Sequence, residues 1–275
     1  MPVLLALLSS LLWGAADFLG GTAARRLHAL VVVGASQAIA LVVLVPLVAT
    51  LGDRPDHLWA GPAAGLAGLI GLSAFYAALA EGTMGVIAPI AAAGAVVPLV
   101  VGLARGDSPS ALQLVGIAVA LGGVVLASGP ELSGGASARP LVLALGSAFC
   151  FGWVAVLVAE GSKGGSGAIL VTLLLMRCSS VGLLVGLWLW RRPGLGLART
   201  DLPLLMAIGV GDVAANATFA FASRGGLLSV IAVLASLYPV VTVLLARQLH
   251  DERLRGIQVA GVVGTLGGVA LLASG

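Results

Sequence analysis

Long apolar runs, separated by short connectors rich in charge, proline and glycine, dominate the sequence. A helix needs about 20 apolar residues to cross the ~30 Å hydrocarbon core of a bilayer. Ten runs approach this length, near residues 2–22, 28–51, 59–80, 84–104, 109–129, 139–159, 167–190, 202–223, 225–246 and 256–274. Several of them are apolar all round and lack the polar face of a soluble helix. The pattern predicts an all-α membrane protein with ten transmembrane helices.

The composition excludes the soluble classes. The chain of 275 residues is 60% hydrophobic and only 9% charged, with a mean hydropathy of +1.14, whereas soluble domains carry roughly 45–50% apolar and about 25% charged residues. The net charge of +3 is scattered over the connectors, so nucleic acid is not an expected partner. The sequence has no Cys/His spacing for a metal and no phosphate-binding Gly-x-x-x-x-Gly-Lys-Ser/Thr motif. We therefore expect no metal, no cofactor and no ATP hydrolysis.

The two halves of the chain repeat one another. The segment PVLLAL at 2–7 recurs as PLVLAL at 140–145. Each half holds five predicted spans, so the second half must enter the membrane from the opposite face. We predict two inverted five-helix repeats, residues 1–135 and 136–275, and inverted repeats are a recurring architecture of secondary transporters.

Three ionisable residues fall inside the predicted spans: Asp17, Arg177 and Asp212. A charge at mid-bilayer costs ~2.5–3.5 kcal/mol even on mild scales. Arg177 keeps its proton and must therefore face a carboxylate, a carbonyl group or water. It either forms a fixed ion pair with Asp212 or binds the carboxylate of an amino acid or another organic anion. Since one arginine cannot neutralise two carboxylates, Asp17 or Asp212 is predicted to carry protons, although Asp17 could instead be an interfacial residue near its helix end.

Helical periodicity adds neighbours to these charges. Residues four apart share one face, so Trp13 should lie with Asp17, and Asn216 with Asp212, facing a central cavity. Tyr76 and Trp153 lie in the interiors or inner ends of their spans and could stack on an aromatic or cationic substrate. Gln37 lies opposite Arg177 in the repeat. The predicted substrate-binding residues are Trp13, Asp17, Gln37, Tyr76, Trp153, Arg177, Asp212 and Asn216.

Prolines inside the spans predict hinges or gates. Pro89 and Pro98 fall in the fourth run and Pro239 in the ninth. A proline lacks the amide hydrogen, and its ring clashes with the preceding turn, so the helix kinks. A static bend fitted to a neighbouring helix is the alternative.

Small residues spaced four apart predict close helix packing. They occur at Ala260, Gly264 and Gly268 and at Gly61 and Gly65. We expect these stripes to pack within a monomer, with a weak homodimer as the alternative.

Motifs spread over the chain match one known family. They are Leu12-Trp13-Gly14, Arg177, Ala222-Ser223-Arg224, Pro239, Leu245-Ala246-Arg247, Glu252-Arg253-Leu254, Gln258, Gly261 and Gly267-Gly268-Val269. Together they resemble the ten-helix EamA branch of the drug/metabolite transporter superfamily. The resemblance implies a secondary transporter and says little about its substrate. The chain departs from the pattern at Gly106-Asp107, where relatives usually carry Gly-Glu, and at Gln37, where many carry arginine.

A second resemblance is confined to the first helix. The segment 17–22 (DFLGGT), followed by Arg25, resembles the small multidrug resistance branch, in which an acidic residue three positions before a glycine binds protons and cationic substrates. It implies that Asp17 is the coupling carboxylate. That branch carries Glu rather than Asp, and the equivalent position of the second repeat is Ala155, so a symmetric acidic pair is missing.

These observations predict a secondary active exporter of small polar metabolites such as amino acids, located in the cell (inner) membrane. Alternating access would operate on a central site between the repeats, coupled to protons or to the solute gradient. Proton-coupled efflux of lipophilic cations is the alternative. Most arginines lie in odd-numbered connectors, which by the positive-inside rule places the termini outside the cytoplasm; relatives with cytoplasmic termini are familiar, so the orientation stays open.

An enzyme is the competing class, because residues 209–212 spell the Gly-x-Gly-Asp pattern of intramembrane aspartyl proteases. That chemistry needs two carboxylates sharing a proton. Asp17 belongs to a distant span and lacks the partner motif, so we expect that the protein is not an enzyme.

Overall fold

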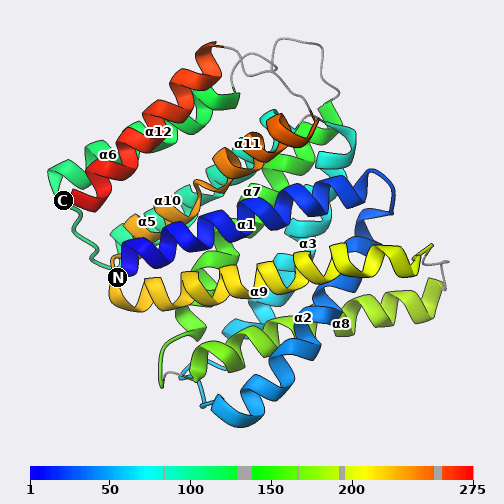
Figure 1. Ribbon diagram of the computed structural model, residues 1–275. Helices are drawn as coiled ribbons and strands as arrows, with labels where there is room; N and C mark the ends of the chain where they lie inside the picture. Colours follow the sequence, from blue (N-terminus) through cyan, green and yellow to red (C-terminus); the bar gives the residue numbers. More distant parts are fainter. Residues whose placement is uncertain (83, 129–137, 166, 192–195, 251–255, 275) are drawn as a thin grey trace.

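The computed structural model describes residues 1–82, 84–128, 138–165, 167–191, 196–250 and 256–274. Over these ranges the chain is helical, and the β-type pairing is confined to an isolated bridge between Pro55 and Gly164. The helices, shown in Figure 1, are α1 (Pro2–Ala24), α2 (Ala29–Leu51), α3 (Ala60–Glu81), α4 (Met84–Ala92), η1 (Ala93–Ala95), α5 (Val96–Ala104), α6 (Ala111–Ser128), α7 (Ala138–Gly161), α8 (Ala168–Arg191), η3 (Arg199–Asp201), α9 (Leu202–Gly225), α10 (Leu228–Ala235), α11 (Tyr238–His250) and α12 (Gly256–Ser274).

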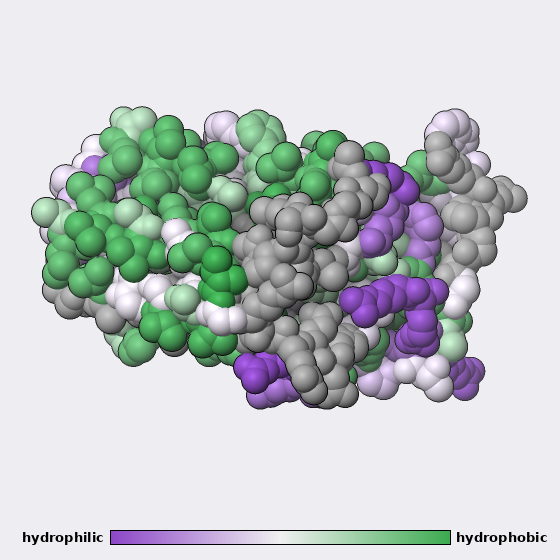
Figure 2. Space-filling model, turned by 90° about the horizontal axis from the view of Figure 1, so that it is seen from above, coloured by the Kyte–Doolittle hydropathy of each residue, from purple (hydrophilic) through white to green (hydrophobic). Residues whose placement is uncertain are grey.

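The predicted all-α membrane class is confirmed for this part of the chain. Seven helical stretches are long and apolar enough to cross a membrane, and two shorter apolar helices cover Ile90–Ala104 and Ala111–Gly123. Large hydrophobic side chains such as Val42, Ile70 and Val142 point outward and are exposed. In Figure 2 most of the visible surface is hydrophobic, and hydrophilic residues gather mainly at one end. The count of ten spans stays a prediction.

The fourth and ninth apolar runs are interrupted rather than continuous. The fourth consists of α4, the tighter turn η1 and α5, and the ninth of α10, a turn at Ser236 and Leu237, and α11. Pro98 and Pro239 follow these interruptions closely, as expected from the missing amide hydrogen. Their role as hinges stays a prediction, and the side chain of Pro89 lies outside the described residues.

The helices that begin the two halves, α1 and α7, run in opposite directions (Figure 1). The start of α1 lies against the end of α9, where a Cβ at Gly225 would come within 3.0 Å of Pro2. From the same end of α9, Arg224 donates hydrogen bonds to the carbonyl oxygens of Gly164 and Gly165, just after α7 ends. The start of α1 and the end of α7 therefore lie on one side of the molecule.

The pair α6 and α12 stands to one side of the other helices (Figure 1). A Cβ at Gly268 would lie 2.5 Å from the amide nitrogen of Ala120, and one at Gly264 would lie 3.6 Å from the Cα of Gly123. The small residues thus let the two helix backbones touch. Gly264 and Gly268 of the predicted stripe pack within the chain, whereas Ala260 is exposed. Gly61 also packs within the chain, since a Cβ there would meet the α8 backbone at 2.8 Å.

Candidate functional site

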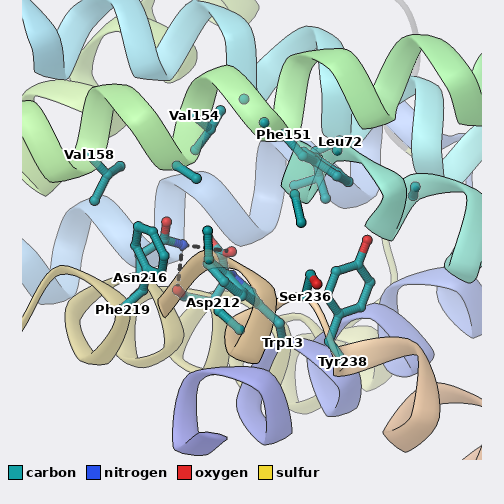
Figure 3. A pocket seen from close by; sticks show the side chains of 18 of the residues that line it. Trp13, Leu72, Phe151, Val154, Val158, Asp212, Asn216, Phe219, Ser236 and Tyr238 are labelled. Carbon is teal, nitrogen blue, oxygen red and sulfur yellow. Dashed lines mark hydrogen bonds between the residues drawn. The ribbon is translucent and has the colours of Figure 1, made fainter. Parts of the chain in front are cut away.

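A cavity lies between the two halves of the chain and is lined by both. Its walls come from α1, α2, α3, α7, α8, α9 and both interrupted runs, and they bound about 820 Å³ of space, the open part included. Most of the lining is apolar or small. The polar exceptions are Asp17, Gln37, Arg177, Asp212, Asn216, Ser236 and Tyr238. Figure 3 shows several of these side chains converging on the space.

Arg177 is buried, with 1% of its surface exposed, and is the central charge of the cavity. One terminal nitrogen donates to Oε1 of Gln37 at 2.5 Å, and the other donates to Oδ2 of Asp212 at 2.6 Å. The hydroxyl of Ser180 also donates to Gln37, at 3.2 Å. The predicted ion pair between Arg177 and Asp212 is therefore present, and it joins α8 to α9.

The second carboxylate oxygen of Asp212 is occupied as well. Asn216, one turn further along α9, donates through Nδ2 to Oδ1 of Asp212 at 3.1 Å and to its backbone carbonyl at 2.8 Å. Both residues line the cavity, as the spacing of four predicted. Both carboxylate oxygens of Asp212 are thus hydrogen-bonded, one to Arg177 and one to Asn216.

Asp17 is the other carboxylate of the cavity and differs from Asp212 in its partners. It lines the cavity and is 7% exposed, and within the described ranges no residue donates a hydrogen bond to it or pairs with it. Asp17 is thus buried within the protein, and its depth relative to the membrane interface stays a prediction. Trp13 shares its face of α1 and packs against Phe219, with ring centroids 5.7 Å apart. Trp13 and Asp17 therefore share one face of α1 toward the cavity, as the spacing of four predicted.

Two glycines bring the helices that carry these groups close together. A Cβ at Gly209 would lie 2.4 Å from the carbonyl oxygen of Ser36, so α9 touches α2 next to Gln37. A Cβ at Gly14 would lie 2.6 Å from the carbonyl oxygen of Tyr238, so α11 begins against α1. Gly209 belongs to the pattern that suggested a protease, and its position in the fold is explained by packing.

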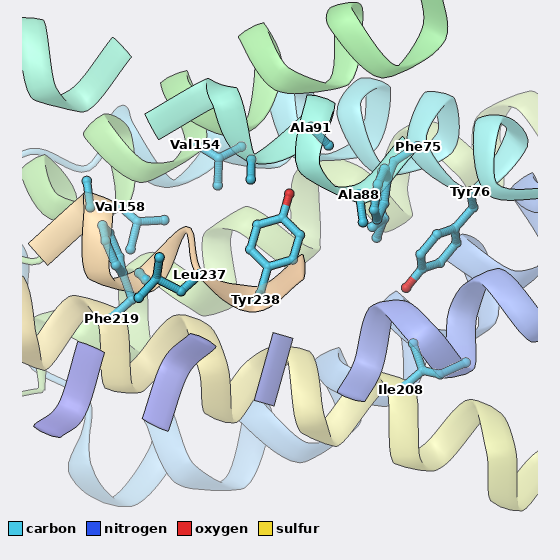
Figure 4. Close-up of a cluster of buried hydrophobic side chains, with 14 of the residues drawn as sticks. Phe75, Tyr76, Ala88, Ala91, Val154, Val158, Ile208, Phe219, Leu237 and Tyr238 are labelled. Carbon is cyan, nitrogen blue, oxygen red and sulfur yellow. The ribbon is translucent and has the colours of Figure 1, made fainter. Parts of the chain in front are cut away.

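Tyr238 is a cavity residue that the sequence did not single out. It is 7% exposed, and its hydroxyl has no hydrogen-bond partner among the described residues. Figure 3 shows its ring among the side chains that line the cavity. In Figure 4 the ring rises from the start of α11, with the hydroxyl directed toward Ala91 and Val154. The available signal was a tyrosine directly before Pro239, at the interruption of a predicted span.

The structure does not bring Trp153 and Tyr76 to the cavity. Trp153 is 40% exposed and meets Phe149 edge to face at 6.4 Å; its neighbour Gly152 faces the cavity instead, and consecutive helical residues point about 100° apart. The expectation for Trp153 is thereby corrected. Tyr76 is buried, but its ring lies over Gly20 of α1, where a Cβ would come within 2.3 Å of the hydroxyl oxygen (Figure 4).

An ionic cluster joins the two halves outside the cavity. Glu160, at the end of α7, contacts His57 at 2.9 Å, Arg105 at 2.7 Å and Lys163 at 3.0 Å. His57 and Arg105 belong to connectors of the first half. The cluster therefore ties that half to α7 at one end of the molecule.

Asp107 provides a second link at the same end. Its Oδ2 accepts a hydrogen bond of 2.9 Å from the backbone amide of Ser229, and α10 begins at Leu228. A carboxylate at this place satisfies an amide that the helix itself leaves free. Although Asp107 replaces the glutamate that relatives usually carry after Gly106, it still provides a carboxylate acceptor at the junction of the halves. The Glu252-Arg253-Leu254 motif lies outside the described residues.

Comparisons with known proteins agree with this architecture. The model of the EamA-like transporter family matches residues 1–129 and again residues 138–274. The chain belongs to the EamA-like transporter family. Among solved structures, 27 chains match; one crystal structure covers 98% of this chain and 95% of its own, with a TM-score of 0.76 and 16% identity, which supports the fold alone. No curated protein matches the sequence.

Family membership indicates that this EamA-like protein is a membrane transporter of the drug/metabolite type. The geometry adds a reason against the aspartyl protease alternative. A shared proton needs two carboxylates that are both free, and Asp212 is engaged by Arg177 and Asn216.

Proposed function

We propose that this EamA-like transporter is a secondary active exporter of small polar metabolites such as amino acids, working by alternating access in the cell membrane. One observation carries the proposal. A cavity lined by both halves encloses Arg177, whose charge is balanced by Asp212, and a second carboxylate, Asp17, that has no ion-pair partner among the described residues. A polar group of this kind inside an apolar protein marks a substrate or ion pathway by default.

The interrupted helices support a moving site. Gly94 and Pro98 of the fourth run and Ser236 and Tyr238 of the ninth line the cavity. Transporters with repeated halves bind substrate at such discontinuous helices and rock one half against the other. The links at Glu160 and Asp107 join the halves at one end and would have to break when that end opens.

Asp17 is our candidate for the proton carrier. The charged and titratable residues around it are Asp212 of α9, Arg177 of α8, Tyr238 of α11 and Tyr76 of α3. Asp212 was the other candidate, but its two carboxylate oxygens accept hydrogen bonds from Arg177 and Asn216. We infer that Asp17 exchanges a proton for substrate during the cycle.

Efflux of lipophilic cations is the second candidate, and the apolar lining favours it. Leu72, Phe151, Val154, Met176 and Phe219 supply much of the wall, and a carboxylate among apolar side chains suits a cation with a hydrophobic body.

Counterflow in proteoliposomes tests the proposal. Vesicles preloaded with amino acids, organic anions or lipophilic cations are assayed for uptake of the labelled compound, with protein-free vesicles as the control. We expect exchange of amino acids by the native protein, and uptake driven by a pH gradient that Asp17→Asn removes. Exchange of lipophilic cations alone would select the second candidate, and no exchange of any solute would refute the transport proposal.

A further inference from the structure

The cavity extends toward the end of the molecule at which α7 stops. Val158 of α7, Phe219 of α9 and Ala232 of α10 line it, and each lies within two turns of the helix terminus at this end. Figure 3 shows Val158 and Phe219 on the same side of the space. Glu160 follows Val158 by two residues, about 3 Å further along the helix axis. The ionic cluster around Glu160 therefore lies next to this end of the cavity.

The three partners of Glu160 differ in the half of the chain to which they belong. Nε2 of His57 lies 2.9 Å from Oε1, and Nη1 of Arg105 donates to Oε2 at 2.7 Å. Both residues belong to the first half. Nζ of Lys163 lies 3.0 Å from each carboxylate oxygen, but Lys163 follows Glu160 by three residues in the second half. Two contacts thus cross between the halves, and the third does not.

Arg105 is held in place by its own half. Its backbone amide donates to the carbonyl oxygens of Val101 and Gly102, so the residue ends α5. A relative movement of the halves therefore carries Arg105 away from Glu160. Lys163 moves with Glu160, because only three residues of chain separate them.

This difference determines what Glu160 loses when the halves separate. Its side chain is 11% exposed, and a carboxylate in such surroundings is strongly destabilised when it has no partner. The contacts to His57 and Arg105 would be lost, whereas the contact to Lys163 would remain. Lys163 thus keeps the carboxylate paired after the other two contacts have broken.

We propose that Glu160 is the latch of a gate at this end of the cavity. His57 and Arg105 hold it when the gate is closed, and Lys163 alone holds it when the gate is open. The inference rests on the proposed function, because alternating access requires this end to open and close. It predicts effects of opposite sign: loss of Arg105 favours the open gate, and loss of Lys163 disfavours it.

Thiol labelling of a residue behind the latch tests the proposal without a substrate. Val158 is suitable because it lines the cavity, is 0% exposed and is similar in size to cysteine. The parent protein carries Val158→Cys, with the two native cysteines removed by Cys150→Ala and Cys178→Ala. The rate at which the anionic reagent sulfonatoethyl methanethiosulfonate modifies the purified full-length protein is followed by mass spectrometry.

Two matched variants in this parent remove the same charge from the same carboxylate. Arg105→Gln should raise the labelling rate by about three- to tenfold, a range between an exposed ion pair and a hydrogen bond to a buried charge. Lys163→Gln should lower the rate by about two- to threefold, because the open gate would leave Glu160 without a partner. Since both variants change the net charge equally, electrostatic attraction of the reagent cannot produce the difference.

Glu160→Gln provides a second comparison. It removes the acceptor of all three partners and should raise the labelling rate by about tenfold or more. Glu81→Gln is its control, because Glu81 pairs with Arg139 of the other half and its side chain is 37% exposed. This pair joins the end of α3 to the start of α7, at the opposite end of the molecule. We expect no increase in labelling from Glu81→Gln.

The outcomes separate the latch from the transport proposal. Changes of the same sign in Arg105→Gln and Lys163→Gln, or an unchanged rate in Glu160→Gln, would overturn the latch. Labelling changes of opposite sign without counterflow of any solute would keep the latch and refute transport. Counterflow by the native protein, with equal labelling rates in all variants, would keep transport and overturn the latch.

Discussion

The two halves of the transporter place equivalent positions around one cavity but fill them with different chemistry. Gln37 and Arg177 are equivalent by the repeat, and so are Asp17 and Ala155; all four line the cavity. The charged members lie on different halves, Asp17 on the first and Arg177 on the second. The two halves therefore contribute to one cavity, but the charged group that each supplies has no charged counterpart at the equivalent position of the other half.

The largest effect should come from removing the charge of the second half. Arg177→Ala leaves the half-buried Asp212 without its partner, and breaking a buried ion pair by removing one member costs about 3–5 kcal/mol. The equivalent change Gln37→Ala removes one neutral acceptor and should cost only about 1–3 kcal/mol. Thermal unfolding of the purified proteins in detergent measures both.

A double variant makes this prediction stricter. Arg177→Met combined with Asp212→Leu leaves no unpaired charge and should recover most of the stability lost in Arg177→Ala. If Arg177→Ala were no less stable than Gln37→Ala, the guanidinium would not be the element that joins α8 to α9.

Moving the carboxylate between halves should give an intermediate effect. Asp17→Ala is expected to abolish pH-driven uptake, whereas Asp17→Ala combined with Ala155→Asp returns an acidic group to the cavity from α7 and should restore part of it. Uptake in proteoliposomes with an imposed pH gradient is the measurement, and Ala155→Asp alone is the control. A double variant as inactive as Asp17→Ala would mean that the carboxylate must come from α1.

The smallest effect should appear where the first half caps a helix of the second. Asp107→Ala removes the acceptor for the amide of Ser229 and should destabilise the protein by about 0.5–2 kcal/mol. Asp107→Asn keeps a side-chain oxygen and should retain most of the stability. Equal losses in the two variants, read from thermal unfolding, would instead assign the effect to the negative charge.

The sequence predicted that Asp17, Arg177 and Asp212 would face the cavity, because an unpaired charge exposed to lipid is costly. Arg177 had to face a carboxylate, a carbonyl group or water, and Asp212, near the middle of the next predicted span, was one of the two partners considered. The spacing of four likewise predicted that Trp13 would accompany Asp17. These inferences needed only helical geometry and the cost of an unpaired charge.

The remainder depended on helix rotation and on breaks that no spacing reveals. Trp153 follows Gly152, and a rotation of one residue decides which of them meets the cavity. Tyr238 enters the cavity because the ninth run stops at Ser236 and Leu237 and starts again with a new direction. Proline marked these interruptions, but which side chain the break would turn inward could not be inferred from the sequence.

The contact of Gly14 with Tyr238 and Val241 shows how closely α1 approaches the start of α11. A methyl group at position 14 would fall 2.5 Å from Cβ of Val241 and 2.6 Å from the Tyr238 carbonyl oxygen, so α1 and α11 would have to separate. The absence of a side chain at this one position therefore allows the two helices, which carry the cavity residues Trp13, Asp17 and Tyr238, to pack backbone against backbone.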